Sequence, residues 1–121
     1  MSRLRFVLAL AAVALVGVIA AGSASAATPT LTATLSGDNA FKIGLLFKGK
    51  PVKTLKAGTY KIVGNDQART HDYRLRGPGV NKATSVTGKG KFTWTVKLKP
   101  GKYTYLCDPH KSFMKGSFTV K

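Results

Sequence analysis

The sequence predicts an all-β sandwich of roughly seven to eight strands in one domain. Three observations support this fold class. Apolar and polar residues alternate along several short runs, most clearly over residues 92–98, and such alternation places side chains on opposite faces of a strand. Turn residues, mainly glycine, proline, asparagine and aspartate, separate the runs. No run after residue 27 has the periodicity of an amphipathic helix, so a sandwich or a barrel is favoured.

The first 26 residues predict a secretory signal peptide with an apolar helix. Arg3 and Arg5 form a basic start, residues 6–27 carry no charge, and small residues close the run at Ala24-Ser25-Ala26. This order is typical of export signals that are cleaved after the small residues. The alternative is a single membrane-anchoring helix, since the run is nearly long enough to span a bilayer. We expect cleavage after Ala26, no stable transmembrane segment afterwards, and a secreted, periplasmic or cell-envelope location.

Residues 27–121 are predicted to form one domain, because roughly 95 residues can enclose one hydrophobic core. Cys107 is the only cysteine, so no internal disulfide can form. A free thiol is reactive in an oxidising compartment, and binding to a metal would protect it. From the cysteine count alone, a metal ligand and a structural or intermolecular cysteine are equal alternatives.

The charge of the chain is strongly positive. The formal net charge is +16, and loss of Arg3 and Arg5 leaves about +14 on the domain. One interpretation is a set of solvated strand faces that keep the protein soluble; another is attraction to acidic protein partners or to an anionic cell surface. Nucleic acid is not an expected partner, because the chain carries an export signal and no recognised nucleic-acid motif.

Eight runs have strand character, in this order: residues 30–36, 41–47, 60–63, 70–76, 83–87, 92–98, 103–107 and 116–120. The first alternates threonines with Leu31, Ala33 and Leu35, which gives it one buried face. The second is apolar but alternates less cleanly, and the fifth is the weakest. No internal repeat and no long linker divides the domain.

The fourth run carries different side chains on its two faces. His71, Tyr73 and Leu75 share one face, and Asp72 lies with arginines on the other. Taken alone, a histidine at the start of a strand is more often a surface residue than a metal ligand. The pattern at this run therefore predicts a strand but no site.

The sixth and seventh runs predict a hairpin. Residues 92–98 place Phe92, Trp94, Val96 and Leu98 on one buried face. Proline and glycine at the second and third positions of residues 99–102 fit a type II turn, after which residues 103–107 return antiparallel. The last run closes the domain with Phe118 and Val120 facing inward.

Three side chains with ligand atoms follow this hairpin within a short loop. Cys107, His110 and Met114 offer a thiolate, an imidazole and a thioether, and His71 is the only other histidine. The sulfurs are soft ligands, imidazole suits copper, and no carboxylate pair stands beside them to favour a hard ion. Strand ends gather at the poles of a sandwich, so the four residues can converge. The hypothesis is a mononuclear copper site made from His71, Cys107, His110 and Met114.

The order of these residues is similar to that of the ligands in cupredoxins, the family of plastocyanin, pseudoazurin and amicyanin. The shared pattern is an upstream His, then Cys-x-x-His, then Met-x-Gly leading into a closing strand; here it is formed by His71, Cys107, His110 and Met114. The flanking residues 70–78 and 92–120 also resemble cupredoxin strands. The resemblance therefore covers most of the domain.

The resemblance implies a Greek-key β-sandwich, one copper ion per chain, and electron transfer rather than enzymatic catalysis. In cupredoxins the loop histidine lies at the surface and is the usual exit for the electron. On that basis His110, with Pro109 and Phe113 nearby, would be the docking point for a redox partner. The positive charge favours an acidic partner, and we expect the domain to act as a monomer.

The chain departs from the family at residue 72. Cupredoxins commonly carry Asn or Ser directly after the first histidine, where it helps to tie the two ligand segments together, and this chain has Asp72. We expect Asp72 to keep that role by accepting a hydrogen bond from a backbone N–H near Cys107; the alternative is an ion pair with Arg69, Arg74 or Arg76. Its charge bears on the reduction potential more than on copper binding.

Two other functions stay open at this point. The first is a module that stores or delivers copper without electron transfer, and the second is a metal-free sandwich that binds acidic surfaces through its lysines. A nucleophilic pair of Cys107 and His110 is disfavoured, because no third orienting group or oxyanion device is recognisable.

Overall fold

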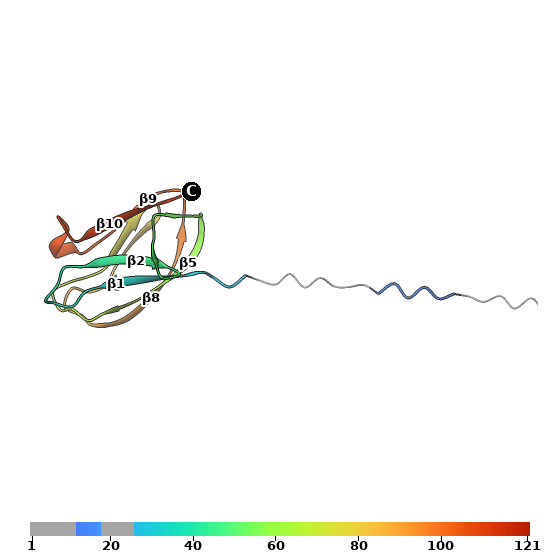
Figure 1. Ribbon diagram of the computed structural model, residues 1–121, viewed down its shortest axis with the longest axis horizontal. Helices are drawn as coiled ribbons and strands as arrows, with labels where there is room; N and C mark the ends of the chain where they lie inside the picture. The colour runs from blue at the N-terminus through green and yellow to red at the C-terminus, as the bar shows by residue number, and fades with distance from the viewer. Residues whose placement is uncertain (1–11, 18–25) are drawn as a thin grey trace, which may run out of the picture.

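Two five-stranded sheets face each other in the computed structural model of the protein, which describes residues 12–17 and 26–121 (Figure 1). The strand order is β3-β2-β1-β5-β8 in the first sheet and β4-β10-β9-β6-β7 in the second. This arrangement confirms the predicted all-β sandwich.

The strands of the first sheet are β1 (Thr30–Leu35), β2 (Ile43–Phe47), β3 (Lys50–Pro51), β5 (Gly58–Asp66) and β8 (Gly90–Leu98). Those of the second are β4 (Thr54–Leu55), β6 (Arg74–Gly77), β7 (Val80–Ala83), β9 (Gly101–Leu106) and β10 (Lys115–Val120). The 3-10 turn η1 (Asp108–His110) lies between β9 and β10.

The predicted strands differ from the observed ones in several places. The short strands β3 and β4 were not predicted, because two residues are too few to show a period. Residues 83–87 were predicted as a weak strand, whereas the strand β7 ends at Ala83. Residues 60–63 form the centre of the nine-residue strand β5, which pairs with β8 along its whole length.

The topology brings strands that are distant in the sequence side by side. β1 pairs in parallel with β5 and antiparallel with β2, and β10 lies between β9 and β4. The chain passes back and forth between the sheets, as in Greek-key sandwiches. Inward-facing residues of both sheets form the core, among them Leu31, Ile62, Leu98 and Phe118.

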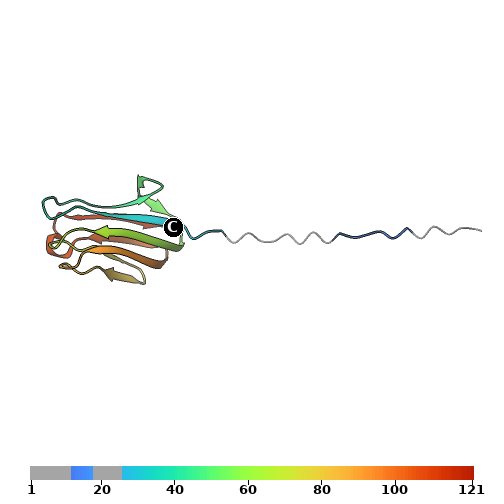
Figure 2. The same ribbon diagram turned by 90° about the horizontal axis from the view of Figure 1, so that it is seen from below.

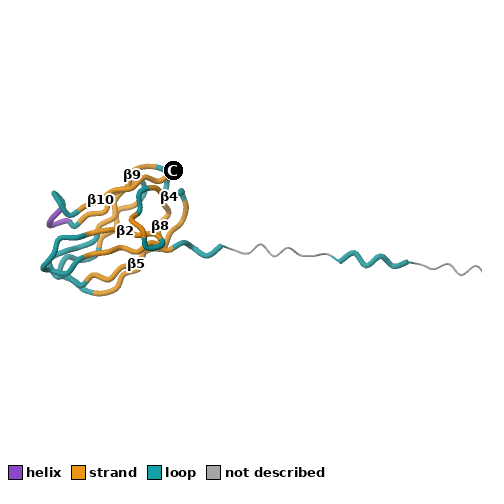
Figure 3. Tube along the Cα trace, viewed as in Figure 1, coloured by secondary structure: helices purple, strands orange, loops and turns teal. Residues whose placement is uncertain are grey.

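The sandwich has two poles, which the long strands connect (Figures 2 and 3). We call the first the η1 pole: it holds η1 and the connections at residues 36–42, 67–73 and 107–114. We call the second the N-terminal pole: residues 26–29 enter the sandwich there, beside the C-terminus and the connections at residues 48–57 and 98–101.

The predicted leader at residues 1–26 lies for the most part outside the described residues, and the predicted cleavage after Ala26 is not tested by the structure. Across residues 12–17 and 26–121, no helix is both long enough and apolar enough to cross a membrane.

Candidate metal centre

The four predicted ligand residues all lie at the η1 pole. Cys107 directly follows β9, His110 ends η1, and Met114 directly precedes β10. His71 lies in the connection between β5 and β6. The side chains of His71, Cys107 and Met114 are buried, and that of His110 is partly exposed.

The prediction that residues 70–76 form one strand is wrong, because β6 begins only at Arg74. Before that point the backbone of Tyr73 bonds to Thr84. The Tyr73 N–H donates to Thr84 Oγ1 at 2.9 Å, and the Tyr73 carbonyl accepts from the Thr84 N–H at 3.0 Å. These bonds replace a strand ladder and leave the histidine in a loop.

A carboxylate from another loop fixes the backbone just before His71. Asp38 Oδ1 accepts hydrogen bonds from the N–H groups of Arg69 and Thr70 at 2.8 and 3.0 Å, and from Thr70 Oγ1 at 2.7 Å. The pKa of Asp38 lies below its ordinary value, chiefly because of the bond from the Thr70 hydroxyl. This clamp joins residues 36–42 to the segment that carries His71.

The ligand atoms of three residues form a compact triangle. His71 Nδ1 lies 3.1 Å from His110 Nδ1, and Cys107 Sγ lies 3.6 Å and 3.5 Å from these two nitrogens. The point equidistant from these corners is about 2.0 Å from each atom, close to the length of a metal–imidazole bond. A metal ion therefore fits between the three atoms without rearrangement of the side chains.

A backbone carbonyl determines the tautomer of His71. Its Nε2 lies 2.8 Å from the carbonyl oxygen of Ala40, which can only accept a hydrogen bond. A neutral His71 ring must therefore carry its proton on Nε2, and its Nδ1 lone pair faces Cys107 and His110. Hydrogen bonds of this kind orient metal-binding histidines and raise the basicity of the ligand nitrogen.

Backbone hydrogen bonds close the loop between Cys107 and Met114. The His110 N–H donates to the Cys107 carbonyl at 3.1 Å, and the Met114 N–H donates to the His110 carbonyl at 2.8 Å. The Cys107 N–H in turn donates to the Met114 carbonyl at 3.0 Å. Because backbone hydrogen bonds link the three residues to one another, the Cα positions from which their side chains extend are fixed.

Asp72 joins the two segments of the site. Its Oδ1 accepts a hydrogen bond of 2.6 Å from the N–H of Asp108, the residue after Cys107. The predicted bridging role is thereby confirmed. Asp72 is buried, and Arg74, one of the arginines named in the alternative, pairs its guanidinium with Asp108 at 2.8 Å instead.

The pKa values of the two neighbouring carboxyl groups, Asp72 and Asp108, are shifted in opposite directions. Burial raises the pKa of Asp72 from 3.8 to about 6. The pKa of Asp108 is lowered, chiefly by the hydrogen bond with the Asp72 side chain and further by Arg74. A proton shared by the pair therefore resides on Asp72, where it avoids a second buried negative charge.

Burial also raises the pKa of the Cys107 thiol. In the metal-free protein the thiol thus keeps its proton at neutral pH, and the ligand thiolate forms when a metal displaces that proton. A buried, protonated thiol is a poor nucleophile, so the chemistry of this residue favours metal binding over catalysis.

Two exposed aromatic rings surround the outer edge of the site. Phe41 and Phe113 are 53% and 60% exposed, although large apolar side chains at other positions of the sandwich are mostly covered. Phe41 makes edge-to-face contacts with both His71 and His110, with centroid distances of 5.6 and 5.1 Å. Phe113 lies 5.6 Å from His110. The partly exposed histidine is therefore set in an apolar patch.

Sequence reasoning missed the contributions of residues 36–42. Asp38 lies between the first two predicted strands, and Phe41 is the first residue of the second, whereas β2 begins at Ile43. The turn residues gave no signal of the clamp, because its partners lie about thirty positions away in the sequence. The carbonyl of Ala40 could not have been found, since every residue has one.

A sequence profile of copper-binding proteins of the plastocyanin/azurin family matches residues 47–121. The matched span includes His71 and the whole loop from Cys107 to Met114. No curated protein sequence matches the chain significantly.

Solved structures of copper proteins are similar to the sandwich. Rusticyanin matches with a TM-score of 0.53 at 18% identity, over 78% of this chain and 76% of its own. Auracyanin from the photosynthetic bacterium Roseiflexus castenholzii, reduced with dithionite, matches with a TM-score of 0.52 at 18% identity, over 79% and 99%. Reduced rusticyanin gives 0.51 at 19% identity, over 78% of both chains. Identities this low support the shared fold alone.

Proposed function

Because the chain belongs to the plastocyanin/azurin family of copper-binding proteins, we propose that it is a one-electron carrier whose copper ion is held by His71, Cys107, His110 and Met114. Bound copper supplies the Cu(II)/Cu(I) couple. The protein holds the ion in one geometry, brings one ligand to the surface and excludes water from the others.

The triangle of His71 Nδ1, His110 Nδ1 and Cys107 Sγ is the observation that carries this proposal. Two imidazoles and a thiolate in a trigonal set are typical of blue-copper electron-transfer sites. The Nδ1 lone pair of His71 is directed by the Ala40 carbonyl, and the other two residues are joined by the loop hydrogen bonds. A ligand set prepared in this way changes little between the two oxidation states.

Met114 is proposed as the weak axial ligand. Its side chain is 1% exposed, and its backbone is hydrogen-bonded to both Cys107 and His110. A thioether is a soft, uncharged donor, and a long axial bond to sulfur tunes the potential of such sites. Substitution of Met114 should therefore shift the potential while copper stays bound.

The electron is proposed to leave through His110, the ligand that is partly exposed. Phe41 and Phe113 form an apolar rim around it, which a redox partner can cover and so exclude water from the contact. The net positive charge favours an acidic partner protein. A docking surface of this kind needs no substrate pocket, consistent with a carrier rather than an enzyme.

We place this carrier outside the cytoplasm, as a monomeric domain of residues 27–121 released from a signal peptide at residues 1–26. The support is the basic, apolar and small-residue order of the leader. An unpaired cysteine in an exported protein would also be protected as a copper ligand.

Voltammetry and electron self-exchange of residues 27–121 loaded with copper test the proposal. This span contains every strand and core residue that the structure describes. We expect a reversible one-electron wave, rapid self-exchange, and slow release of copper to a Cu(I) chelator. Slow self-exchange together with ready release would contradict the carrier and favour a storage or delivery module.

A pair of variants distinguishes a copper-binding protein from the metal-free alternative. In the Cys107→Ser, His110→Ala double variant the redox wave should disappear, because two of the proposed ligands are lost. Met114→Leu is the matched variant that keeps all three ligands of the triangle and should retain a shifted wave. No wave from the unmodified domain under the same loading would point to the metal-free alternative.

A further inference from the structure

The charges of the domain are distributed unequally between the two poles. All four acidic residues of the chain lie at the η1 pole: Asp38, Asp66, Asp72 and Asp108. Each has partners there, such as Thr70 for Asp38, Ala68 for Asp66 and Arg74 for Asp108. Among the residues that the structure describes, the N-terminal pole consequently has no negative side chain.

Six exposed lysines cover the N-terminal pole. They are Lys48, Lys50, Lys53, Lys56, Lys99 and Lys121. The connection at residues 48–57 joins β10 there, with the Lys121 N–H donating to the Leu55 carbonyl and the Ala57 N–H donating to the Lys121 carbonyl. Because strands at both edges of the pole contribute, the lysines form one cationic face and not a flexible tail.

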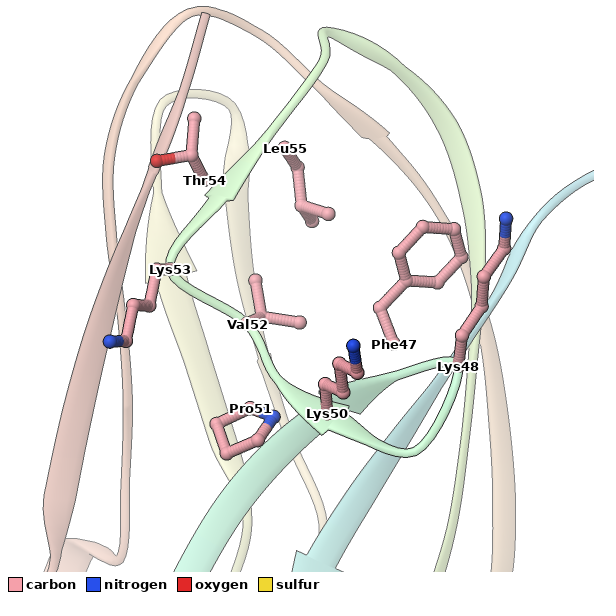
Figure 4. Close-up of a pocket in the computed structure, with 8 residues that line it drawn as sticks. All are labelled: Phe47, Lys48, Lys50, Pro51, Val52, Lys53, Thr54 and Leu55. Carbon is pink, nitrogen blue, oxygen red and sulfur yellow. The ribbon is translucent and has the colours of Figure 1, made fainter.

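A hollow in this face has an apolar floor. Its volume is about 400 Å3, and Phe47, Val52 and Leu55 form part of its lining. Figure 4 shows the amine of Lys50 near Val52 and Phe47 and that of Lys48 beside Phe47, while Lys53 extends outward on the other side of Val52. A surface of this composition matches the boundary of a membrane, where anionic headgroups adjoin the first methylene groups of the acyl chains.

We propose that the N-terminal pole binds the surface of an anionic phospholipid bilayer. The lysines contact the headgroups, and the hollow between residues 47 and 55 accepts the glycerol and upper acyl region of one lipid. Each basic residue near an anionic membrane surface strengthens binding severalfold. Several of them on one rigid face bind without the ordering cost of a flexible tail.

The path of the chain favours a bilayer over a soluble polyanion. Residues 26–29 enter the sandwich at the same pole, where the Pro29 carbonyl accepts a hydrogen bond of 2.9 Å from the Lys61 N–H. The uncharged run at residues 6–27 directly precedes this point in the sequence. The chain thus passes from the uncharged run into the sandwich at the same pole that carries the lysines.

This placement gives the binding a consequence for electron transfer, which rests on the proposed function. A domain bound by its N-terminal pole directs the opposite pole, with His110, Phe41 and Phe113, away from the bilayer. The exposed ligand then stays free to meet a partner. The lipid contact itself requires no copper.

Flotation with lipid vesicles tests the proposal. The probe is residues 27–121, so that the apolar run cannot insert, and it is used with and without copper. Vesicles contain phosphatidylcholine alone or mixed with phosphatidylglycerol. We expect binding to the mixed vesicles only, equally for both forms of the protein, so a failure of copper loading would leave this outcome unchanged.

Two triple variants remove the same charge from different poles. Lys48→Gln, Lys50→Gln, Lys53→Gln changes the proposed face, and Lys42→Gln, Lys89→Gln, Lys91→Gln is the matched control near the η1 pole. The first triple should weaken binding to the mixed vesicles on the order of 100-fold, and the second by only a few-fold. Matching circular dichroism spectra check that both variants are folded.

Three results would overturn the proposal. The first is equal weakening by both triples, which would mean that overall charge and not the face drives binding. The second is no binding of the unmodified domain to the mixed vesicles. The third is that a soluble polyanion, such as polyglutamate, binds the domain as tightly as the vesicles do, and that its affinity falls by the same factor in the first triple variant. The bilayer would then not be the specific occupant.

Discussion

Asp72 connects the electrostatics of the centre to its geometry, because it is buried beside His71 and accepts the Asp108 N–H. An ionised carboxylate there stabilises the more positive oxidised copper. Asp72→Asn should therefore raise the reduction potential by on the order of tens of millivolts at pH 8, where the carboxyl is ionised. The amide oxygen of asparagine can still accept from Asp108, so the copper spectrum should change little.

Voltammetry of the two copper-loaded proteins measures this effect, with Asp66→Asn as a control for a buried acid of the same pole that does not bond to the ligand loop. An unchanged or lower potential in Asp72→Asn would show that the carboxylate does not act on the copper electrostatically.

The same residue predicts a pH dependence of stability in the metal-free protein. The pKa of Asp72 rises from 3.8 to about 6 on folding. A raised pKa means that its contribution to stability is fully present below 3.8 and is lost as the pH rises to about 6. The free energy of unfolding, taken relative to Asp72→Asn, should fall across this range by at most about 3 kcal/mol.

Urea unfolding of both metal-free proteins at a series of pH values provides the two curves. Subtracting them removes the contributions of Asp38 and Asp66, and leaves the titration of Asp72 together with its coupling to Asp108. A difference that stays flat between pH 4 and 6, or that rises, would contradict protonation of Asp72 in the folded state.

The sequence predicted which side chains form the centre, but not the contacts that orient them. Cys107 and His110 are close in the sequence, so their convergence needs only a turn, and His71 was the only histidine left to join them. The tautomer of His71 depends on the Ala40 carbonyl. No sequence pattern indicates such a contact, because it joins a backbone carbonyl to a side chain 31 positions away.

At the scale of elements, the loop at residues 36–42 acts as a support for the centre. It supplies the Ala40 carbonyl to His71 and the Phe41 ring to the outer edge, and Asp38 clamps it to residues 69–70. Asp38→Ala should loosen the loop and weaken copper affinity by about tenfold, the lower range for residues that support metal ligands.

Competition with a Cu(I) chelator measures that affinity. Asp38→Asn is the matched variant, because its amide oxygen can accept the same hydrogen bonds, and it should retain most of the affinity. If Asp38→Ala binds copper as tightly as the unmodified domain, the clamp has no part in holding His71.

The failed strand prediction at residues 70–76 has a cause at this scale. Apolar and polar residues do alternate over residues 70–76, but Tyr73 uses its backbone N–H and carbonyl in hydrogen bonds to Thr84 instead of a strand ladder. The side chains of His71, Asp72 and Tyr73 are all buried. Three consecutive buried side chains result from tertiary packing around this loop. A pattern of alternating apolar and polar residues cannot predict them.

At the scale of the whole molecule, the positive charge should influence encounter with an acidic partner. The domain carries about +14, large enough to steer an acidic protein at low ionic strength. The second-order rate of electron transfer to an acidic cytochrome should therefore fall as salt is added. Stopped-flow measurements with a basic cytochrome serve as the control, and their rates should rise or stay level.

Constant rates with the acidic cytochrome across the salt series would remove the steering argument. The lysines would then act in solubility and at the N-terminal pole only, without a role in redox encounter.

The all-β class was predictable because alternation and turn residues agree along the chain. The strand pairings that form the two sheets were less predictable. The parallel contact of β1 with β5 and that of β4 with β10 join segments far apart in the sequence. Neither is encoded by a local pattern, since both depend on which edges the two sheets leave available.

The visible absorption spectrum of residues 27–121 after addition of Cu(II) tests the central claim most directly. If His71, Cys107 and His110 hold copper as a trigonal set, the protein should turn blue at one equivalent, from charge transfer between the Cys107 thiolate and copper. Cys107→Ser should stay colourless under the same conditions. A colourless unmodified domain whose Cys107 still reacts with a thiol reagent after copper addition would contradict the account.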